Sequence, residues 1–314
     1  MKNKVNLGVL LALLSGLLWS LNTLLFSILI QPEGNNIIIF TIISALYNDS
    51  SSVIWLLIIF LIFYDKKSAI NFKPRRTDLL FVLSSIIGAS LGLFFYILSI
   101  LLSSVEITTI LTMSYPIVAR FSVILVNKKY TTKDMITFIL LCIAILILSN
   151  ERGYIWLPAL MCALCWAIEG IICEYGVKNY RNPEEALMIR QITSTTFLFI
   201  AFFLISKFNS QNNLSIVNHL NNSYPIIFLS IIGLISYLFY YISISKIGAV
   251  KSMSLNISAA IFSITILNIL NGNYELKYII CSTLIFIGTL LCIKDQKKLM
   301  QLFLQQDSVL DLKN

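Results

Sequence analysis

Charged residues are scarce in this chain of 314 residues, at 12% of the total, whereas hydrophobic residues make up 58%. A soluble domain typically carries about 25% charged residues. A water-exposed globular surface is therefore excluded for most of the chain, and the mean hydropathy of +0.86 agrees with this. The composition predicts an all-α integral membrane protein embedded in a lipid bilayer.

Residues of catalytic and metal-binding motifs are also few. The chain has a single histidine and none of the usual zinc-protease, serine-hydrolase or phosphate-loop motifs. Glu184, Glu185 and Arg190 are similar to the EExxxR motif of membrane proteases, but the spacing is one residue too long and those enzymes need several histidines. Cys162 and Cys165 have C-x-x-C spacing without a second ligand pair, which favours packing over metal binding. We therefore predict no enzyme activity, no cofactor and no metal site.

The net charge of +8 does not indicate nucleic acid, because no basic face with interleaved aromatic residues is present. Most lysines and arginines instead fall in loops on the side of the N-terminus. Only Arg152, Lys207 and Lys277 fall in loops on the other side. The positive-inside rule then predicts that both termini are cytoplasmic.

Apolar runs of about 20 residues predict membrane-spanning helices. Ten such runs are present, at approximately 7–30, 37–64, 78–101, 105–127, 133–150, 154–177, 184–206, 224–245, 249–270 and 276–293. They divide into a first repeat at 1–150, a second repeat at 151–293 and a polar cytoplasmic tail at 294–314.

The division into two repeats rests on matched residues. With an offset of 147 residues, Trp19 aligns with Trp166 and Asn22 with Glu169, and Tyr96 in the third run matches Tyr240 in the eighth. Because each repeat has an odd number of helices, the second must enter the membrane from the opposite side. The sequence therefore predicts a 5+5 inverted repeat, an architecture of secondary transporters in which substrate binds near the bilayer midplane.

Several segments carry a family resemblance. They are Cys162–Glu169, Glu185–Ser194, Ile235–Ile242 and Leu255–Ser258, together with Pro116 in the fourth run. With the 5+5 layout, they make the chain similar to the drug/metabolite transporter superfamily of the EamA type, and within it to the bacterial LicB-type choline permeases. The resemblance implies a transporter in the bacterial cytoplasmic membrane that imports choline or a related quaternary ammonium compound, with H+ as coupling ion. It allows a homodimer. An EamA-type exporter of amino acids, other metabolites or cationic drugs is the alternative.

A quaternary ammonium ion has no N–H to donate, so aromatic faces and a nearby carboxylate are what its recognition requires. Glu169 lies in an apolar run, where a carboxylate is costly and usually faces a cavity or a partner. It is a candidate counter-charge or proton-coupling group, and the alternative is a hydrogen bond to a helix carbonyl. The candidate aromatic residues are Trp19, Trp166, Tyr96, Tyr237, Tyr240 and Tyr241, although such residues also form interfacial belts or fill helix bundles.

Polar residues in other apolar runs are the remaining candidates. Asn22 and Asn256 could bind a substrate hydroxyl or join helices. Asp49 in the second run matches the level of Arg190 in the seventh, which suggests a buried ion pair acting as a lock or a gate, since each charge alone would be expensive there. Separate pairing of each with polar neighbours is the alternative.

Overall fold

The computed structural model describes residues 2–29, 36–63, 75–127, 130–149, 156–208, 225–271 and 275–292, and these are helical apart from short turns. The prediction of an all-α protein is confirmed for them, while the tail at 294–314 lies outside the described residues. The helices are α1 (Lys2–Leu29), α2 (Ile37–Phe63), α3 (Asp78–Ser84), the π-helix η2 (Ser85–Gly92), α4 (Leu93–Leu102), α5 (Val105–Thr112), α6 (Tyr115–Asn127), α7 (Thr132–Ser149), α8 (Leu157–Asn179), α9 (Pro183–Phe208), α11 (Pro225–Ile247), α12 (Ala249–Asn256), α13 (Ser258–Asn271) and α14 (Leu276–Cys292).

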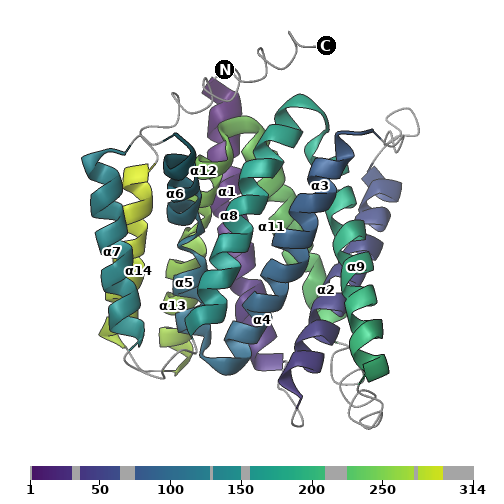
Figure 1. Cartoon of the computed structure of the whole chain (residues 1–314), viewed down its shortest axis with the longest axis horizontal. Helices are drawn as coiled ribbons and strands as arrows, with labels where there is room; N and C mark the ends of the chain where they lie inside the picture. Colours follow the sequence, from purple (N-terminus) through teal and green to yellow (C-terminus); the bar gives the residue numbers. More distant parts are fainter. Residues whose placement is uncertain are drawn as a thin grey trace.

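The helices form one bundle with three regions. The pair α7 and α14 lies at one end, the pair α2 and α9 lies at the other, and α1, α8 and α11 run through the middle (Figure 1). α1 packs along α11, so the first helix of the chain contacts a helix from its second half. The centre of the bundle is thus built from both halves of the sequence.

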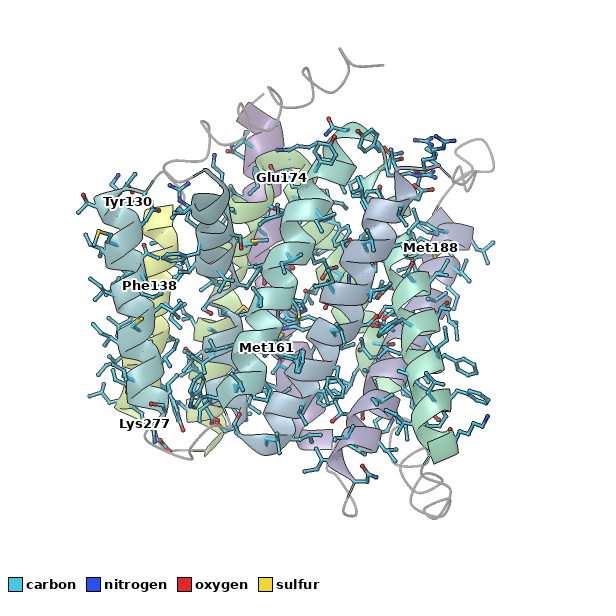
Figure 2. All side chains as sticks on the ribbon, viewed as in Figure 1. Tyr130, Phe138, Met161, Glu174, Met188 and Lys277 are labelled. Atoms are coloured by element: carbon cyan, nitrogen blue, oxygen red, sulfur yellow. The ribbon has the colours of Figure 1, made fainter. Side chains whose placement is uncertain are left out.

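The first helices of the two halves run in opposite directions. α1 begins at the upper edge of Figure 1. On α8, Met161 lies below Glu174 (Figure 2), so this helix runs towards the upper edge. The last helices are also antiparallel, because Tyr130 before α7 lies at the upper edge whereas Lys277 in α14 lies at the lower edge. An inverted repeat requires these directions.

Eight helical segments are long and apolar enough to cross a membrane by length and composition. A further apolar helix, Leu276–Leu291, is shorter. The remaining candidate is divided between α5 and α6, with 8 and 13 residues. The molecule is therefore a multi-pass membrane protein, while the number of ten spans stays a prediction.

The segment predicted as one helix over 105–127 is broken in the structure. α5 ends at Thr112 and α6 begins at Tyr115, with a two-residue turn between them. Pro116 is the second residue of α6, where its missing N–H removes no intrahelical bond. Within a continuous helix the same proline would remove a bond and clash with the preceding turn. Pro116 is therefore a local cause of the break.

The segment predicted as one helix over 249–270 is broken as well, at Ile257. No proline or glycine marks this position, but α1 approaches it closely. A Cβ atom placed on Gly16 would lie 2.7 Å from the backbone oxygen of Asn256 and 3.2 Å from the backbone nitrogen of Ala259. The local sequence gives little signal for this break, and a tertiary contact with a glycine of α1 accompanies it.

The segment predicted over 78–101 differs from a regular α-helix in its middle, where Ser85–Gly92 form a π-helix. A π-helical turn is rare and occurs mostly at functional sites. The matched helix α11 is α-helical throughout. The two repeats therefore differ in backbone geometry at corresponding helices.

Side chains on the outside of the bundle are apolar. Phe138 on α7 is 50% exposed and points away from the bundle at its edge (Figure 2). Exposed leucine, isoleucine and phenylalanine side chains continue along α7 and α9. Contiguous exposed apolar surface is expected where lipid covers a protein.

Charged contacts at the upper edge join neighbouring helices. Arg181 binds the carboxylate of Asp78 at 2.6 Å and that of Glu185 at 3.3 Å. The hydrogen bond with Asp78 raises the pKa of the Arg181 guanidinium. Glu174 on α8 accepts a hydrogen bond of 2.9 Å from the backbone N–H of Ala249 at the start of α12. These contacts connect the helices of the two halves above their buried centre.

Candidate functional site

A cavity lies between α1, α6, α8, α11 and α12, beside both helix breaks. It contains about 480 Å³ of empty space, counting the part that opens to solvent, and pockets for small organic ligands commonly have about 300–1,000 Å³. The lining residues are Ser15, Trp19, Met113, Tyr115, Trp166, Glu169, Gly170, Cys173, Ser236, Tyr237, Tyr240, Tyr241 and Asn256.

The cavity brings together most of the candidate residues that the sequence singled out. Trp19, Trp166, Glu169, Tyr237, Tyr240, Tyr241 and Asn256 all contribute to its wall. Tyr96 and Asn22 do not. Tyr96 is 3% exposed and its hydroxyl pairs with that of Thr23, while Asn22 lies in ordinary contact range of Gly233. These two residues can act on the cavity only through the residues that line it.

Aromatic rings form a connected group on one part of the wall. The Trp19 ring centroid lies 5.4 Å from that of Trp166 and 5.1 Å from that of Tyr237, and both pairs meet edge to face. Behind them, the Tyr96 ring lies 5.4 Å from Trp19 and 5.2 Å from Trp166. Such geometry is favourable for aromatic quadrupoles. It holds the two indoles of the predicted repeat against each other at the cavity.

Glu169 is buried, with 6% exposure, and is not a bare charge. Arg190 Nε donates to its Oε1 at 2.5 Å, and the Tyr241 hydroxyl donates to the same oxygen at 3.0 Å. Arg190 also donates from Nη1 to the side chain of Gln191 at 2.8 Å, and its Cζ lies 3.9 Å from the ring centroid of Tyr237. The guanidinium is therefore fully engaged beside the cavity.

The expected ion pair between Asp49 and Arg190 is replaced in the structure. Arg190 pairs with Glu169, whereas the Asp49 carboxylate accepts hydrogen bonds from Ser194 and, at 3.1 Å, from Asn48. Matching levels in two repeats place residues at the same depth, but the rotation of each helix decides which side chain is met. The roles of Asp49 and Arg190 in coupling or gating stay predictions.

Two acids and one base are thus buried together. Asp49 is 0% exposed, Arg190 1% and Glu169 6%. With all three ionised, the group carries one net negative charge. Uncompensated charge is expensive at this depth, so a cation or a proton at the group would be favourable.

The sequence reasoning missed six lining residues, namely Ser15, Met113, Tyr115, Gly170, Cys173 and Ser236. A signal was available for Ser15, which precedes Trp19 by four residues and therefore shares its helix face. Tyr115 directly precedes Pro116, the proline that accompanies the first helix break. The others carry no distinguishing pattern, because small residues are ordinary in membrane helices.

Two glycines of the π-helix fit against the cavity wall. A Cβ atom on Gly88 would collide with the side chain of Glu169, and one on Gly92 would lie 2.8 Å from the indole Nε1 of Trp166. Because these glycines are four residues apart and their partners three apart, η2 presents one notch to α8. The absence of two methyl groups on η2 thus allows Glu169 and Trp166 to take their positions.

We expect Gly88→Ala to lower the free energy of unfolding by roughly 1–3 kcal/mol, because overpacking displaces the Glu169 side chain. Thermal unfolding of the purified protein in detergent measures this. Gly288→Ala is the matched control, since its Cβ would meet Ile117 Cδ1 at 3.3 Å and Thr137 Cγ2 at 3.5 Å. Equal stability of the two variants would contradict the notch.

Metal binding finds no support in the described ranges, where no group of three or more histidine, cysteine, aspartate or glutamate side chains could hold an ion. Cys162 and Cys165, which have C-x-x-C spacing, are both free thiols. The chemistry of the cavity is instead that of binding, through aromatic rings, a carboxylate, hydroxyls and an amide.

A helical bundle with a buried polar cavity, built from two halves that begin in opposite directions, defines a membrane transporter. The model of the EamA-like transporter family matches residues 6–150 and again residues 152–294. The chain belongs to this family and contains two copies of its repeat.

Two comparisons with individual proteins agree with this assignment. Protein LicB of Haemophilus influenzae (strain ATCC 51907 / DSM 11121 / KW20 / Rd) is 27% identical over 268 residues, which cover 82% of this chain and 87% of that protein. A solved crystal structure, described only as that of a protein, superposes with a TM-score of 0.57 at 13% identity. It covers 91% of this chain and 97% of its own. At that identity, the likeness concerns the fold alone.

Proposed function

We propose that the protein carries choline or a related quaternary ammonium ion across the cytoplasmic membrane. The observation that supports this most is the pairing of an aromatic cavity wall with a buried charge group of one net negative charge. A quaternary ammonium ion interacts with ring faces rather than through N–H bonds, at about 2 kcal/mol or more per desolvated ring. A small cation of this kind would satisfy both features at once.

Import is the proposed direction. A membrane potential that is negative inside favours cation entry by about 2.3 kcal/mol per charge per 100 mV. H+ is the proposed coupling ion, because a proton on Asp49 or Glu169 would neutralise the same excess charge as the substrate. An EamA-type exporter of metabolites or cationic drugs remains the second candidate, since the cavity would also bind a cationic drug.

Alternating access would follow from the opposed directions of α1 and α8. We propose ten spans, in which α5 and α6 together form the fourth and α14 forms the tenth, with both termini in the cytoplasm. In inverted-repeat transporters, one half rocks against the other around a site between them. The cavity, with walls from both halves, is the proposed site.

Uptake of labelled choline into proteoliposomes tests the function. We expect uptake that increases with an imposed potential, negative inside, and that responds to a pH gradient. Competition by quaternary ammonium analogues should reduce it. Absence of uptake together with absence of choline binding would reject the quaternary ammonium substrate. Binding accompanied only by efflux would favour the exporter.

Trp166→Ala is expected to weaken choline binding by roughly 30-fold, because loss of one ring from a desolvated cation removes about 2 kcal/mol. Trp156→Ala is the matched control, since Trp156 lies at the start of the same helix and does not line the cavity. Equilibrium binding to the purified protein measures both. Unchanged affinity in Trp166→Ala would remove the aromatic wall from the proposal.

A further inference from the structure

A chain of hydrogen bonds joins four cavity residues from four helices. The Tyr115 hydroxyl on α6 donates to Asn256 Oδ1 on α12 at 3.3 Å, and Asn256 Nδ2 donates to Ser15 Oγ on α1 at 2.7 Å. Ser15 Oγ lies 3.2 Å from Ser236 Oγ on α11. All four residues line the cavity. The chain connects the two broken segments with the two central helices.

The hydrogens of this chain are already used. The Ser236 hydroxyl donates to the backbone oxygen of Ser15 at 2.8 Å, so the Ser15 hydroxyl hydrogen points to Ser236 Oγ. The Tyr115 hydroxyl hydrogen is used on Asn256 or, at 3.4 Å, on the backbone oxygen of Met253. Each hydroxyl oxygen keeps a lone pair, whereas only one amide N–H of Asn256 remains. The chain therefore offers acceptors to a ligand and hardly any donors.

We propose that this chain of Tyr115, Asn256, Ser15 and Ser236, which we name the acceptor chain, selects the substrate class. It makes the transporter prefer a quaternary ammonium ion that carries a hydroxyl group over one that carries a carboxylate or no polar group. The inference rests on the proposed function and deepens it. A ligand hydroxyl can donate to the acceptor chain, whereas a carboxylate has no hydrogen to donate and an alkyl group leaves the lone pairs unmatched.

The charges beside the cavity support the same preference. A carboxylate is normally recognised by a guanidinium, but Arg190 is engaged by Glu169, Gln191 and the Tyr237 ring. The charge group has an excess of acid, which would repel a second carboxylate. Buried donors that make no hydrogen bond within the described residues do exist near the wall, on Trp19, Trp166, Tyr237 and Tyr240. They are neutral, and the oxygen of a hydroxyl ligand can accept from them as well.

Two serines of α11 form a matched pair for a test. Ser236 donates to the backbone oxygen of Ser15 at 2.8 Å, and Ser243 donates to the backbone oxygen of Gly8 at the same distance. Both serines are buried and lie seven residues apart, so they share a helix face. Only Ser236 lines the cavity. Replacing either one removes the same kind of contact between α1 and α11.

The experiment measures the affinity of the full-length protein for choline, n-propyltrimethylammonium and glycine betaine. In the wild type, we expect choline to bind about 3- to 10-fold more tightly than the propyl compound, the worth of one net hydrogen bond, and betaine to bind more weakly than both. Ser15→Ala should reduce the preference for choline over the propyl compound to near one. Ser236→Ala should free the Ser15 hydroxyl to donate and reduce the preference for choline over betaine. Ser243→Ala should leave all three ratios unchanged.

The outcomes separate this inference from the function on which it rests. If the wild type binds none of the three ions, the proposed function and the acceptor chain both fail. If it binds choline and the propyl compound equally, or if Ser15→Ala keeps the wild-type ratios, the quaternary ammonium function stands and the acceptor chain is rejected. Because ratios of affinities are compared, a general loss of stability in a variant does not imitate the expected result. Should Ser15→Ala fail to fold, the betaine ratio in Ser236→Ala decides the matter.

Discussion

Glu169→Gln is expected to weaken choline binding by roughly 100-fold. A unit charge about 5 Å from the bound cation contributes about 3 kcal/mol at an effective dielectric constant of about 20. The glutamine would leave Asp49 and Arg190 with no net charge, so the attraction for a cation would be lost. Equilibrium binding of labelled choline to the purified variant measures the effect.

The neutral isostere of choline, 3,3-dimethylbutan-1-ol, separates charge from shape. Its affinity should change by no more than about threefold, because it gains nothing from a net negative charge. Glu174→Gln serves as the control variant, since Glu174 lies on the same helix but at the upper edge, outside the cavity wall (Figure 2). An equal loss for the cation and the isostere in Glu169→Gln would contradict the role of Glu169 as a counter-charge.

The second large effect concerns stability. Arg190→Met is expected to lower the free energy of unfolding by about 3–5 kcal/mol, because it leaves a buried carboxylate without its partner. Arg190 is 1% exposed and binds Glu169, Gln191 and the face of Tyr237. Methionine preserves much of the volume, so the loss reports on charge more than on packing. Thermal unfolding in detergent measures it.

A second substitution should restore part of this stability. In Arg190→Met with Glu169→Gln, only Asp49 stays charged, and it keeps its hydrogen bonds from Ser194 and Asn48. Lys207→Met, at an exposed position on the same helix, should change stability by no more than about 0.5 kcal/mol. If the double variant is no more stable than Arg190→Met alone, the ion pair is not what stabilises this part of the bundle.

The aromatic part of the site follows from the repeat in the sequence. Trp19 and Trp166 align at an offset of 147 residues, and in the structure their rings lie 5.4 Å apart. Matched positions in two inverted repeats come close to each other when they lie near the axis that relates the halves. The aligned pair Asn22 and Glu169 shows the limit of this reasoning. Glu169 lines the cavity and Asn22 does not.

The ion pair could not be predicted from the sequence. Asp49 and Arg190 were matched by depth, which is a property of position along a helix. Pairing requires atoms within about 3 Å, and this depends on how each helix is rotated about its axis. The π-helix at Ser85–Gly92 contributes to that rotation, and its glycines admit the Glu169 side chain. Nothing in the spacing of apolar residues indicates such a turn.

The sequence by itself determined the class of the protein, the approximate extent of most membrane helices and the aromatic character of the site. Those properties depend on local hydrophobicity and on a repeat that can be aligned. Only the tertiary structure decided that Glu169 is the partner of Arg190, that two helices are broken, and that Ser15, Tyr115, Ser236 and Asn256 join in one chain. Hydrogen bonds and ion pairs act over about 3 Å. They are fixed only when helices distant in the sequence have packed.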